Sequence, residues 1–191
     1  MVLRQRIYDI DDLWELSHRD VMDPSHYELI DGELIVLSPP GGRHGQLQVR
    51  LSRYLDIFAE VQSLGVVTSD AGYHPPDNRH TLLSPDVAFV SRARAPQPFP
   101  EKYVPLMPDL AVEIVSPGNT RKEVNRKTQI YLSNGSQLVW IVLPRQARVE
   151  VYRRDERQGI KRKTANASEI LSGGDVLPGF ELALQRLYSL N

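Results

Sequence analysis

The sequence predicts a mixed α/β fold, in which a mixed central sheet is flanked by helices and accompanied by an N-terminal β-hairpin. Residues 109–143 contain an apolar strand, a capped helix and a second apolar strand, a unit that joins parallel strands by a right-handed crossover. Residues 27–37 place Asp31 and Gly32 between two apolar stretches, and this dipeptide favours the tight turn of an antiparallel hairpin. Parallel and antiparallel pairing are therefore both expected.

The chain has 191 residues, of which 41% are hydrophobic and 25% charged, as is usual for one globular domain. Within it we expect an N-terminal helical cover over residues 1–26, a core over 27–152, and strands with a short helix over 153–191. No apolar run approaches the roughly 20 residues that cross a bilayer, and no secretory signal is evident. The absence of cysteine excludes disulfides and thiolate metal sites. A cytoplasmic protein without a membrane span is expected.

The hairpin is the first element whose register the sequence predicts. A two-residue turn pairs Ile30 with Glu33 and Glu28 with Ile35. Both glutamates then project from one face of the hairpin, and the opposite face is apolar. The same residues are also what an ordinary strand exposes to water, so this interpretation stays open for both.

The other predicted elements follow from apolar periodicity and from turn residues. They are helices over 9–19 and 44–58, strands over 65–71, 81–90, 138–143, 148–154 and 179–184, a loop over 96–108, and a C-terminal helical turn. Thr120 and Glu123 match a capping box at a helix start, and Asn134 with Gly135 is typical of a helix end.

Two carboxylates interrupt runs that are otherwise apolar. Asp86 lies in Ser-Pro-Asp-Val-Ala-Phe-Val, and Glu113 lies in Leu-Ala-Val-Glu-Ile-Val. Such runs indicate strands buried on both faces, where an ionised group is costly unless it is paired or binds a cation. Simpler interpretations are a loop-capping role for Asp86 and a buried ion pair of Glu113 with an arginine or with Lys127.

Two basic side chains are expected on the sheet-facing sides of helices. His44 opens an apolar helix face that Leu47 continues, and Lys127 shares a face with Val124 and Tyr131. Structural roles remain open for both, because a histidine at a helix start can be satisfied locally and a lysine stem can cover apolar surface.

The oxygen atoms of Asp86 and Glu113 would suit a hard divalent cation such as Mg²⁺ or Mn²⁺, which would offset the burial of two negative charges. A bound cation can lower the pKa of an attacking water and neutralise charge on a phosphoryl group. A nearby lysine could orient that water. This donor set therefore points to phosphoryl chemistry.

Overall charge does not predict nucleic-acid binding, because the formal net charge is -1. Residues 145–163 contain eight basic and three acidic residues, which makes this run a candidate patch for a polyanion. A solvated hairpin is its simpler interpretation.

Taken in order, these blocks resemble the Uma2 family (DUF820) of the PD-(D/E)XK restriction-endonuclease-like superfamily. The resemblance spans about residues 27–152 and rests on Tyr-Glu-Leu-Ile-Asp-Gly-Glu-Leu, Ser-Pro-Pro with His44, the Asp86 and Glu113 strands, and Arg126-Lys127 with Tyr131-Leu132. It implies a restriction-endonuclease-like core.

The resemblance also implies a metal-dependent nuclease site. The implied metal ligands are Asp86, Glu113 and the carbonyl oxygen of Ile114, with Glu33 and His44 lining the site. The superfamily lysine normally lies two residues after the glutamate, where this chain has Val115. Lys127 from the following helix would take its place.

The leading hypothesis is therefore a Mg²⁺- or Mn²⁺-dependent endonuclease that hydrolyses DNA and acts as a homodimer, because two sites can address two strands. The alternative is a catalytically silent nucleic-acid-binding or interaction module, favoured by Val115 and by the lack of a base-reading element. Hydrolysis of a non-nucleic phosphodiester is a third hypothesis. Divalent-ion binding at Asp86 and Glu113 separates the first two, since a binding module needs no metal site.

Overall fold

The computed structural model describes residues 6–18, 27–155 and 159–189. In these segments the main sheet has six strands in the order β3-β4-β5-β6-β7-β8. The strands are β3 (Gly65–Thr68), β4 (Val87–Ser91), β5 (Leu110–Ile114), β6 (Leu138–Leu143), β7 (Arg148–Asp155) and β8 (Gly159–Asn166). β5 and β6 are parallel and the other neighbours are antiparallel. The predicted mixed sheet is confirmed.

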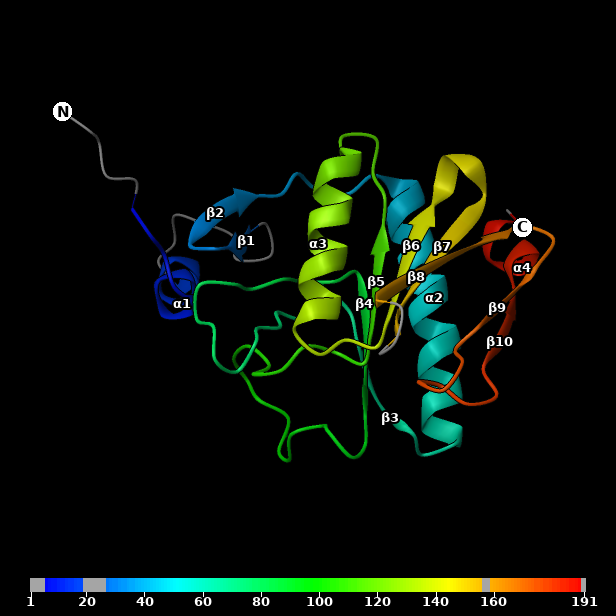
Figure 1. Ribbon diagram of the computed structural model, residues 1–191, viewed down its shortest axis with the longest axis horizontal. Helices are drawn as coiled ribbons and strands as arrows, with labels where there is room; N and C mark the ends of the chain where they lie inside the picture. Colours follow the sequence, from blue (N-terminus) through cyan, green and yellow to red (C-terminus); the bar gives the residue numbers. More distant parts are fainter. Residues whose placement is uncertain (1–5, 19–26, 156–158, 190–191) are drawn as a thin grey trace.

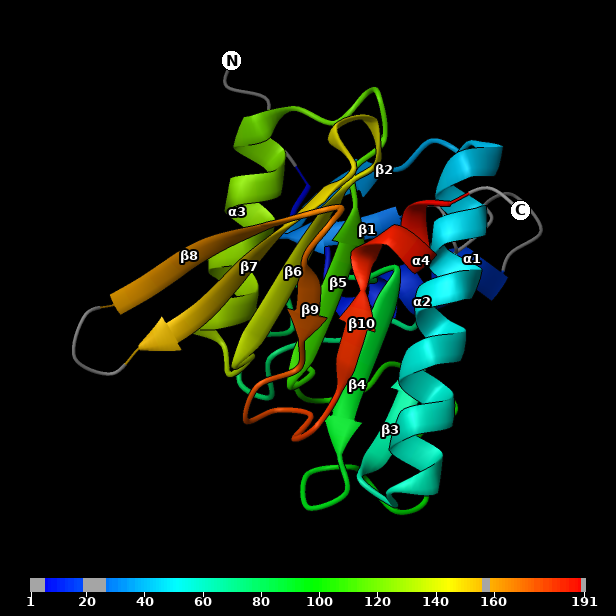
Figure 2. The same ribbon diagram turned by 90° about the vertical axis from the view of Figure 1, so that its right-hand side faces the viewer.

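The sheet lies between two helical layers, with α3 (Arg121–Ser133) on one face and α2 (Gly42–Val61) on the other (Figures 1 and 2). Side chains alternate across β5, so Val112 packs on the α2 side while Ala111 and Glu113 face α3. Both faces are apolar, as the continuous apolar runs predict. Glu113 is thus held over the sheet beneath α3.

Smaller elements complete the two layers. On the α2 side lie β9 (Ile170–Ser172), β10 (Glu181–Ala183) and α4 (Leu184–Tyr188), and the short helix η2 (Pro144–Gln146) joins β6 to β7. α1 (Ile10–His18) packs Leu13 against Leu29 and Leu82. Within the described segments, no helix combines the length and apolar character needed to cross a membrane.

The N-terminal hairpin, β1 (Tyr27–Ile30) and β2 (Glu33–Val36), has the predicted register. Asp31 and Gly32 have φ values of 55° and 80°, the left-handed conformations that a two-residue turn requires. In Figure 1 the hairpin lies beside α3, away from α2. One of its faces is therefore directed at the α3 side of the main sheet.

Two strand predictions differ from the structure. The strand predicted over 81–90 begins only at Val87, because Pro85 has no amide hydrogen for a ladder, and Leu82 and Leu83 form isolated bridges instead. β9 was not predicted as a strand, whereas the interpretation of residues 145–163 as a hairpin agrees with the antiparallel pairing of β7 with β8. Residues 1–5, 19–26 and 156–158 of the predicted N-terminal cover and basic run lie outside the described segments.

Candidate active site

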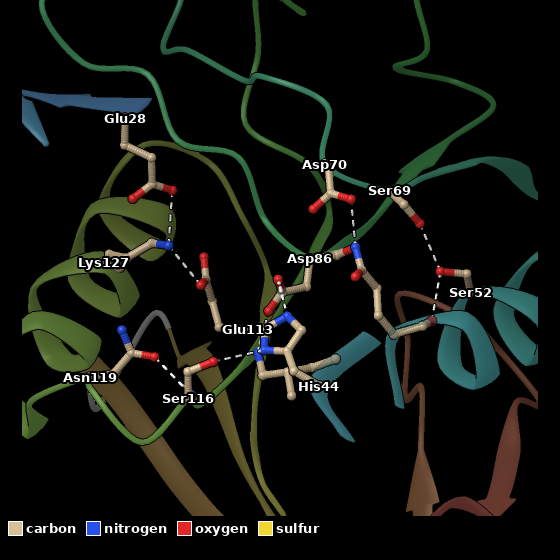
Figure 3. Close-up of polar contacts among 12 residues, drawn as sticks. Glu28, His44, Ser52, Ser69, Asp70, Asp86, Glu113, Ser116, Asn119 and Lys127 are labelled. Carbon is tan, nitrogen blue, oxygen red and sulfur yellow. Dashed lines mark hydrogen bonds and ion pairs between the residues drawn. The ribbon is translucent and has the colours of Figure 1, made fainter. Parts of the chain in front are cut away.

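Asp86 and Glu113 come together at one end of the sheet. Asp86 immediately precedes β4, and Glu113 is the penultimate residue of β5. Val87 pairs with Val112 in the antiparallel ladder, so one further step of this register sets Asp86 opposite Glu113 with both side chains on the same face. Figure 3 shows the two carboxylates as neighbours.

Two side chains of α3 bind the Glu113 carboxylate. Lys127 Nζ lies 2.7 Å from Oε2, and the Tyr131 hydroxyl donates to Oε1 at 2.7 Å. Lys127 and Tyr131 lie one helical turn apart, so they share the face of α3 that covers the sheet. The predicted capping box at Thr120 is present and fixes where this helix starts.

Lys127 also pairs with a second buried acid, Glu28 of β1. Lys127 Nζ lies 2.9 Å from Glu28 Oε1, and the side chain of Glu28 is only 1% exposed. The same oxygen accepts the backbone N–H of Ser84 at 3.0 Å. Glu28 therefore joins Asp86, Glu113, Lys127, Tyr131 and His44 in one polar group, which we call the cluster. The sequence left open whether Glu28 is an ordinary strand acid; its place on the hairpin face shared with Ile30 was the available signal.

Glu33 does not reach this cluster. Its side chain is 54% exposed, and its nearest cation is Arg126, with Nη1 at 3.9 Å from Oε2. Both glutamates project from the same hairpin face, but Glu28 is buried against the main sheet, whereas Glu33 lies beside the turn and is exposed. The structure therefore brings Glu28, and not Glu33, to Lys127 and Glu113.

His44 reaches the cluster from the other layer. It lies in the first turn of α2, with Nε2 2.8 Å from Asp86 Oδ1 and Nδ1 3.1 Å from Ser116 Oγ. The second oxygen of Asp86 accepts the backbone N–H of Ile114 at 2.5 Å. His44 and Ile114 therefore fix both oxygens of Asp86, and Ser116 orients the imidazole.

A polar loop that the sequence did not single out flanks Asp86. Gln48 of α2 donates to Asp70 Oδ2 at 2.7 Å and to the backbone oxygen of Asp86 at 3.0 Å. Burial and the charge of Asp86 raise the pKa of Asp70, while the Gln48 hydrogen bond opposes this effect. Sequence offers no signal for this contact, because the loop after β3 is positioned only by tertiary packing.

The cluster is short of positive charge. Burial raises the pKa of Glu113 to about 7; Lys127 opposes this shift, and the charges of Glu28 and Asp86 add to it. Burial alone would lower the pKa of Lys127, but Glu113 and Glu28 outweigh it and raise that pKa far above its ordinary value. Lys127 is therefore an ammonium at neutral pH.

The pKa of His44 is also raised. Burial disfavours its charged form, but the hydrogen bond to Asp86 and the charge of Asp86 outweigh burial. His44 consequently retains its proton to a higher pH than a free histidine.

The donor set fits a hard divalent cation. Lys127 is the ammonium for two of the three carboxylates, Glu28 and Glu113, and Asp86 is bound by His44. Burial and the neighbouring negative charges raise the pKa of Glu113, so its ionisation is unfavourable without more positive charge. Mg²⁺ usually takes one or two protein carboxylates and completes its shell with water or substrate oxygens. In the described segments no three His, Cys, Asp or Glu side chains are grouped to hold an ion by themselves. Asp86 and Glu113 would be the two carboxylate ligands.

The two hairpin glutamates provide a matched test of the cluster. We expect Glu28→Gln to lower any metal-dependent activity about tenfold, because it loosens Lys127. Glu33→Gln removes only an exposed, long ion pair and should change activity less than about twofold. Initial rates for both variants at equal folded fraction check this. A larger loss in Glu33→Gln than in Glu28→Gln would reverse the assignment.

Comparisons with known proteins bear on the family and the fold of the chain. The family model "Uma2: Putative restriction endonuclease" matches residues 14–185. A search of curated proteins finds no match. The chain is similar to a solved structure described as a putative nuclease belonging to DUF820 from Anabaena variabilis, with a TM-score of 0.79, 18% identity, and coverage of 95% of this chain and 97% of that chain. At this identity the likeness shows the shared fold.

The family description indicates a restriction-endonuclease-like nuclease, and the predicted fold class is confirmed. Because the family model covers most of the chain, the protein belongs to the Uma2 family.

Proposed function

We propose that the protein is a metal-dependent endonuclease that hydrolyses DNA phosphodiester bonds. One observation carries this proposal: Asp86 and Glu113 meet from adjacent strands, with the Lys127 ammonium 2.7 Å from Glu113. The proposed ligands of Mg²⁺ or Mn²⁺, which the resemblance implies, are these two carboxylates and the carbonyl oxygen of Ile114. A divalent ion bound there would supply a Lewis acid and lower the pKa of a water.

Lys127 acts as a fixed cation in this proposal. Its strongly raised pKa excludes it as a general base at neutral pH, because it stays protonated. Held by Glu28 and Glu113, its ammonium can orient a water and stabilise negative charge that develops on a phosphoryl oxygen. Tyr131 keeps its proton for the same reason, since burial and the Glu113 charge raise its pKa well above the ordinary value.

His44 is proposed to orient Asp86 and to hold a proton at the edge of the site. Its hydrogen bond to Asp86 Oδ1 fixes that carboxylate, and its raised pKa keeps part of the population protonated near neutral pH. An imidazolium there could donate to a leaving oxygen.

Nicking of supercoiled plasmid tests the function. Purified protein should convert supercoiled DNA to the open circle with Mn²⁺ or Mg²⁺, and EDTA should stop the reaction. Absence of cleavage above the EDTA control with either metal would contradict the nuclease proposal.

Metal binding is expected to depend on pH through Glu113. A ligand carboxylate must be deprotonated, and the pKa of Glu113 is raised to about 7. Mg²⁺ affinity should therefore rise as pH increases, by up to about tenfold per unit below pH ~7, and level off above it. Calorimetric titrations from acid to mildly alkaline pH measure this; an affinity that is flat across neutrality would exclude Glu113 as a titrating ligand.

A silent nucleic-acid-binding module is the second candidate. It is favoured because both carboxylates already have partners within the chain, His44 and the Ile114 amide for Asp86, and Lys127 and Tyr131 for Glu113. DNA binding without Mg²⁺ or Mn²⁺ binding would favour this candidate. For the nuclease, a homodimer that presents two sites to two strands is the assembly we propose.

A further inference from the structure

A second charged group lies on the same sheet face as the cluster. Glu150 of β7 accepts Arg121 Nη1 at 2.7 Å, and Arg162 Nη1 of β8 lies 4.0 Å from its other oxygen. Tyr152 donates to Glu150 at 2.7 Å and accepts Arg121 Nη2 at 2.9 Å. We refer to these four residues as the arginine group.

The sheet register gives the position of this group relative to the candidate active site. Glu113 pairs with Ile141 of β6, and Ile141 pairs with Glu150. Laterally paired residues project from the same face, and strands lie about 4.8 Å apart, so Glu150 lies about 10 Å from Glu113 across the α3 side. Arg121, the first residue of α3, follows the loop that carries Ser116. The group therefore borders the cluster.

The arginine group has the charge that the cluster lacks. Within the described segments two guanidinium groups share the Glu150 carboxylate, so the arginine group carries a net positive charge. Burial would raise the pKa of Glu150, but Arg121 and Tyr152 lower it overall, so Glu150 stays ionised and continues to hold the arginines. A polyanion bound at the cluster and running along this end of the sheet would meet this positive charge.

The arginines are oriented but not enclosed. The Arg121 side chain is 46% exposed and that of Arg162 is 56% exposed. A guanidinium has five N–H donors, and Arg121 uses one on each Nη atom for Glu150 and Tyr152. The remaining donors are presented to solvent by a side chain whose conformation is already fixed, which lowers the entropic cost of binding an anion.

We propose that Arg121 and Arg162 bind a backbone phosphate of the nucleic-acid strand being cut. This inference rests on the proposed nuclease function. A separation of about 10 Å from Glu113 means that the phosphate held here is a neighbour of the one being cut and not the scissile phosphate itself. Contacts of this kind fix the position of the strand and carry no base specificity. Glu150 and Tyr152 are positioning residues, because they act through the arginines.

Fluorescence anisotropy with a labelled duplex in EDTA, at salt between about 50 and 200 mM, tests the contact apart from cleavage. Arg121→Gln and Arg162→Gln should each weaken binding about fivefold and lower the salt slope by about 1. Arg162→Lys should keep the slope. In Mn²⁺-dependent nicking, KM should rise by a similar factor while kcat changes less than about twofold.

Arg53→Gln is the matched control. Arg53 is an exposed arginine of α2 and, within the described segments, makes no ion pair. It should leave the affinity and the slope unchanged. Thermal melting checks folding; if Arg121→Gln unfolds, Arg162→Gln decides, because its contact with Glu150 is long and exposed.

Unchanged salt slopes in both variants, or an equal loss of DNA affinity in Arg53→Gln, would overturn the phosphate contact. Metal-dependent nicking by the wild type would still support the nuclease in that case. Specific loss of binding in a protein that never nicks would support the contact and contradict the proposed function. A wild type that binds no duplex at any salt would overturn the contact itself.

Discussion

Replacing Glu113 with glutamine is expected to reduce metal-dependent nicking by at least about 100-fold and, above pH ~7, to raise the stability of the fold. Glutamine keeps the shape of the side chain: its amide oxygen can accept from Lys127, and its NH2 group can donate to the hydroxyl oxygen of Tyr131. It removes the charge that would ligate the metal. One substitution should therefore change activity and stability in opposite directions.

The stability effect follows from the pKa of Glu113. Its ordinary value is 4.5, and the fold raises it to about 7. Between these values the folded state binds more protons than the unfolded state, so the contribution of Glu113 to stability falls as pH rises and stays low above pH ~7. The glutamine variant does not ionise and therefore avoids this loss of stability, which is on the order of 3 kcal/mol.

Plasmid nicking and thermal melting at pH ~5 and pH ~8 measure both effects. Glu60→Gln, an exposed change on α2, is the control and should alter neither. Asp86→Asn should also abolish nicking. Nicking that survives in Glu113→Gln would remove Glu113 from the chemistry. A lower melting temperature at pH ~8 would instead show that the pair with Lys127 is chiefly stabilising.

Sequence patterns predicted those features of the site that depend on a single helix, hairpin or strand. The capping box at Thr120 sets the start of α3, so helical periodicity places Lys127 on the sheet side. The turn at Asp31 likewise sets the hairpin register. Burial of Asp86 and Glu113 followed from their apolar neighbours, because an ionised group in such a strand needs a partner.

Contacts between elements were not readable from the sequence. The alignment of β4 with β5, which sets Asp86 opposite Glu113, depends on packing between segments far apart in the chain. Both hairpin glutamates share one face, and only the docking of the hairpin against α3 decides that Glu28 is the buried one. The sequence also did not show that Glu150 lies on the same lateral line as Glu113, because this alignment depends on the pairing of β5 with β6 and of β6 with β7.

Lys127→Met is expected to cost both activity and stability. Lys127 is the one ammonium between Glu28 and Glu113 among the described residues, and its removal leaves two buried carboxylates facing each other. Breaking a buried ion pair from one side typically costs about 3 kcal/mol, so unfolding by denaturant at pH ~8 should show a loss of that order. Nicking should fall at least about 100-fold at pH values where the variant is folded.

The double variant Lys127→Met with Glu28→Gln separates the two roles of the lysine. Removing the Glu28 charge relieves the repulsion, so stability should recover by at least about 1 kcal/mol, a coupling expected of groups in contact. Activity should not recover, because the cation near the phosphoryl group is still absent. Lys122→Met, an exposed change in the same helix, controls for loss of a lysine. If nicking returned together with stability in the double variant, Lys127 would be a structural counter-ion, and the nuclease would work without an ammonium at this position.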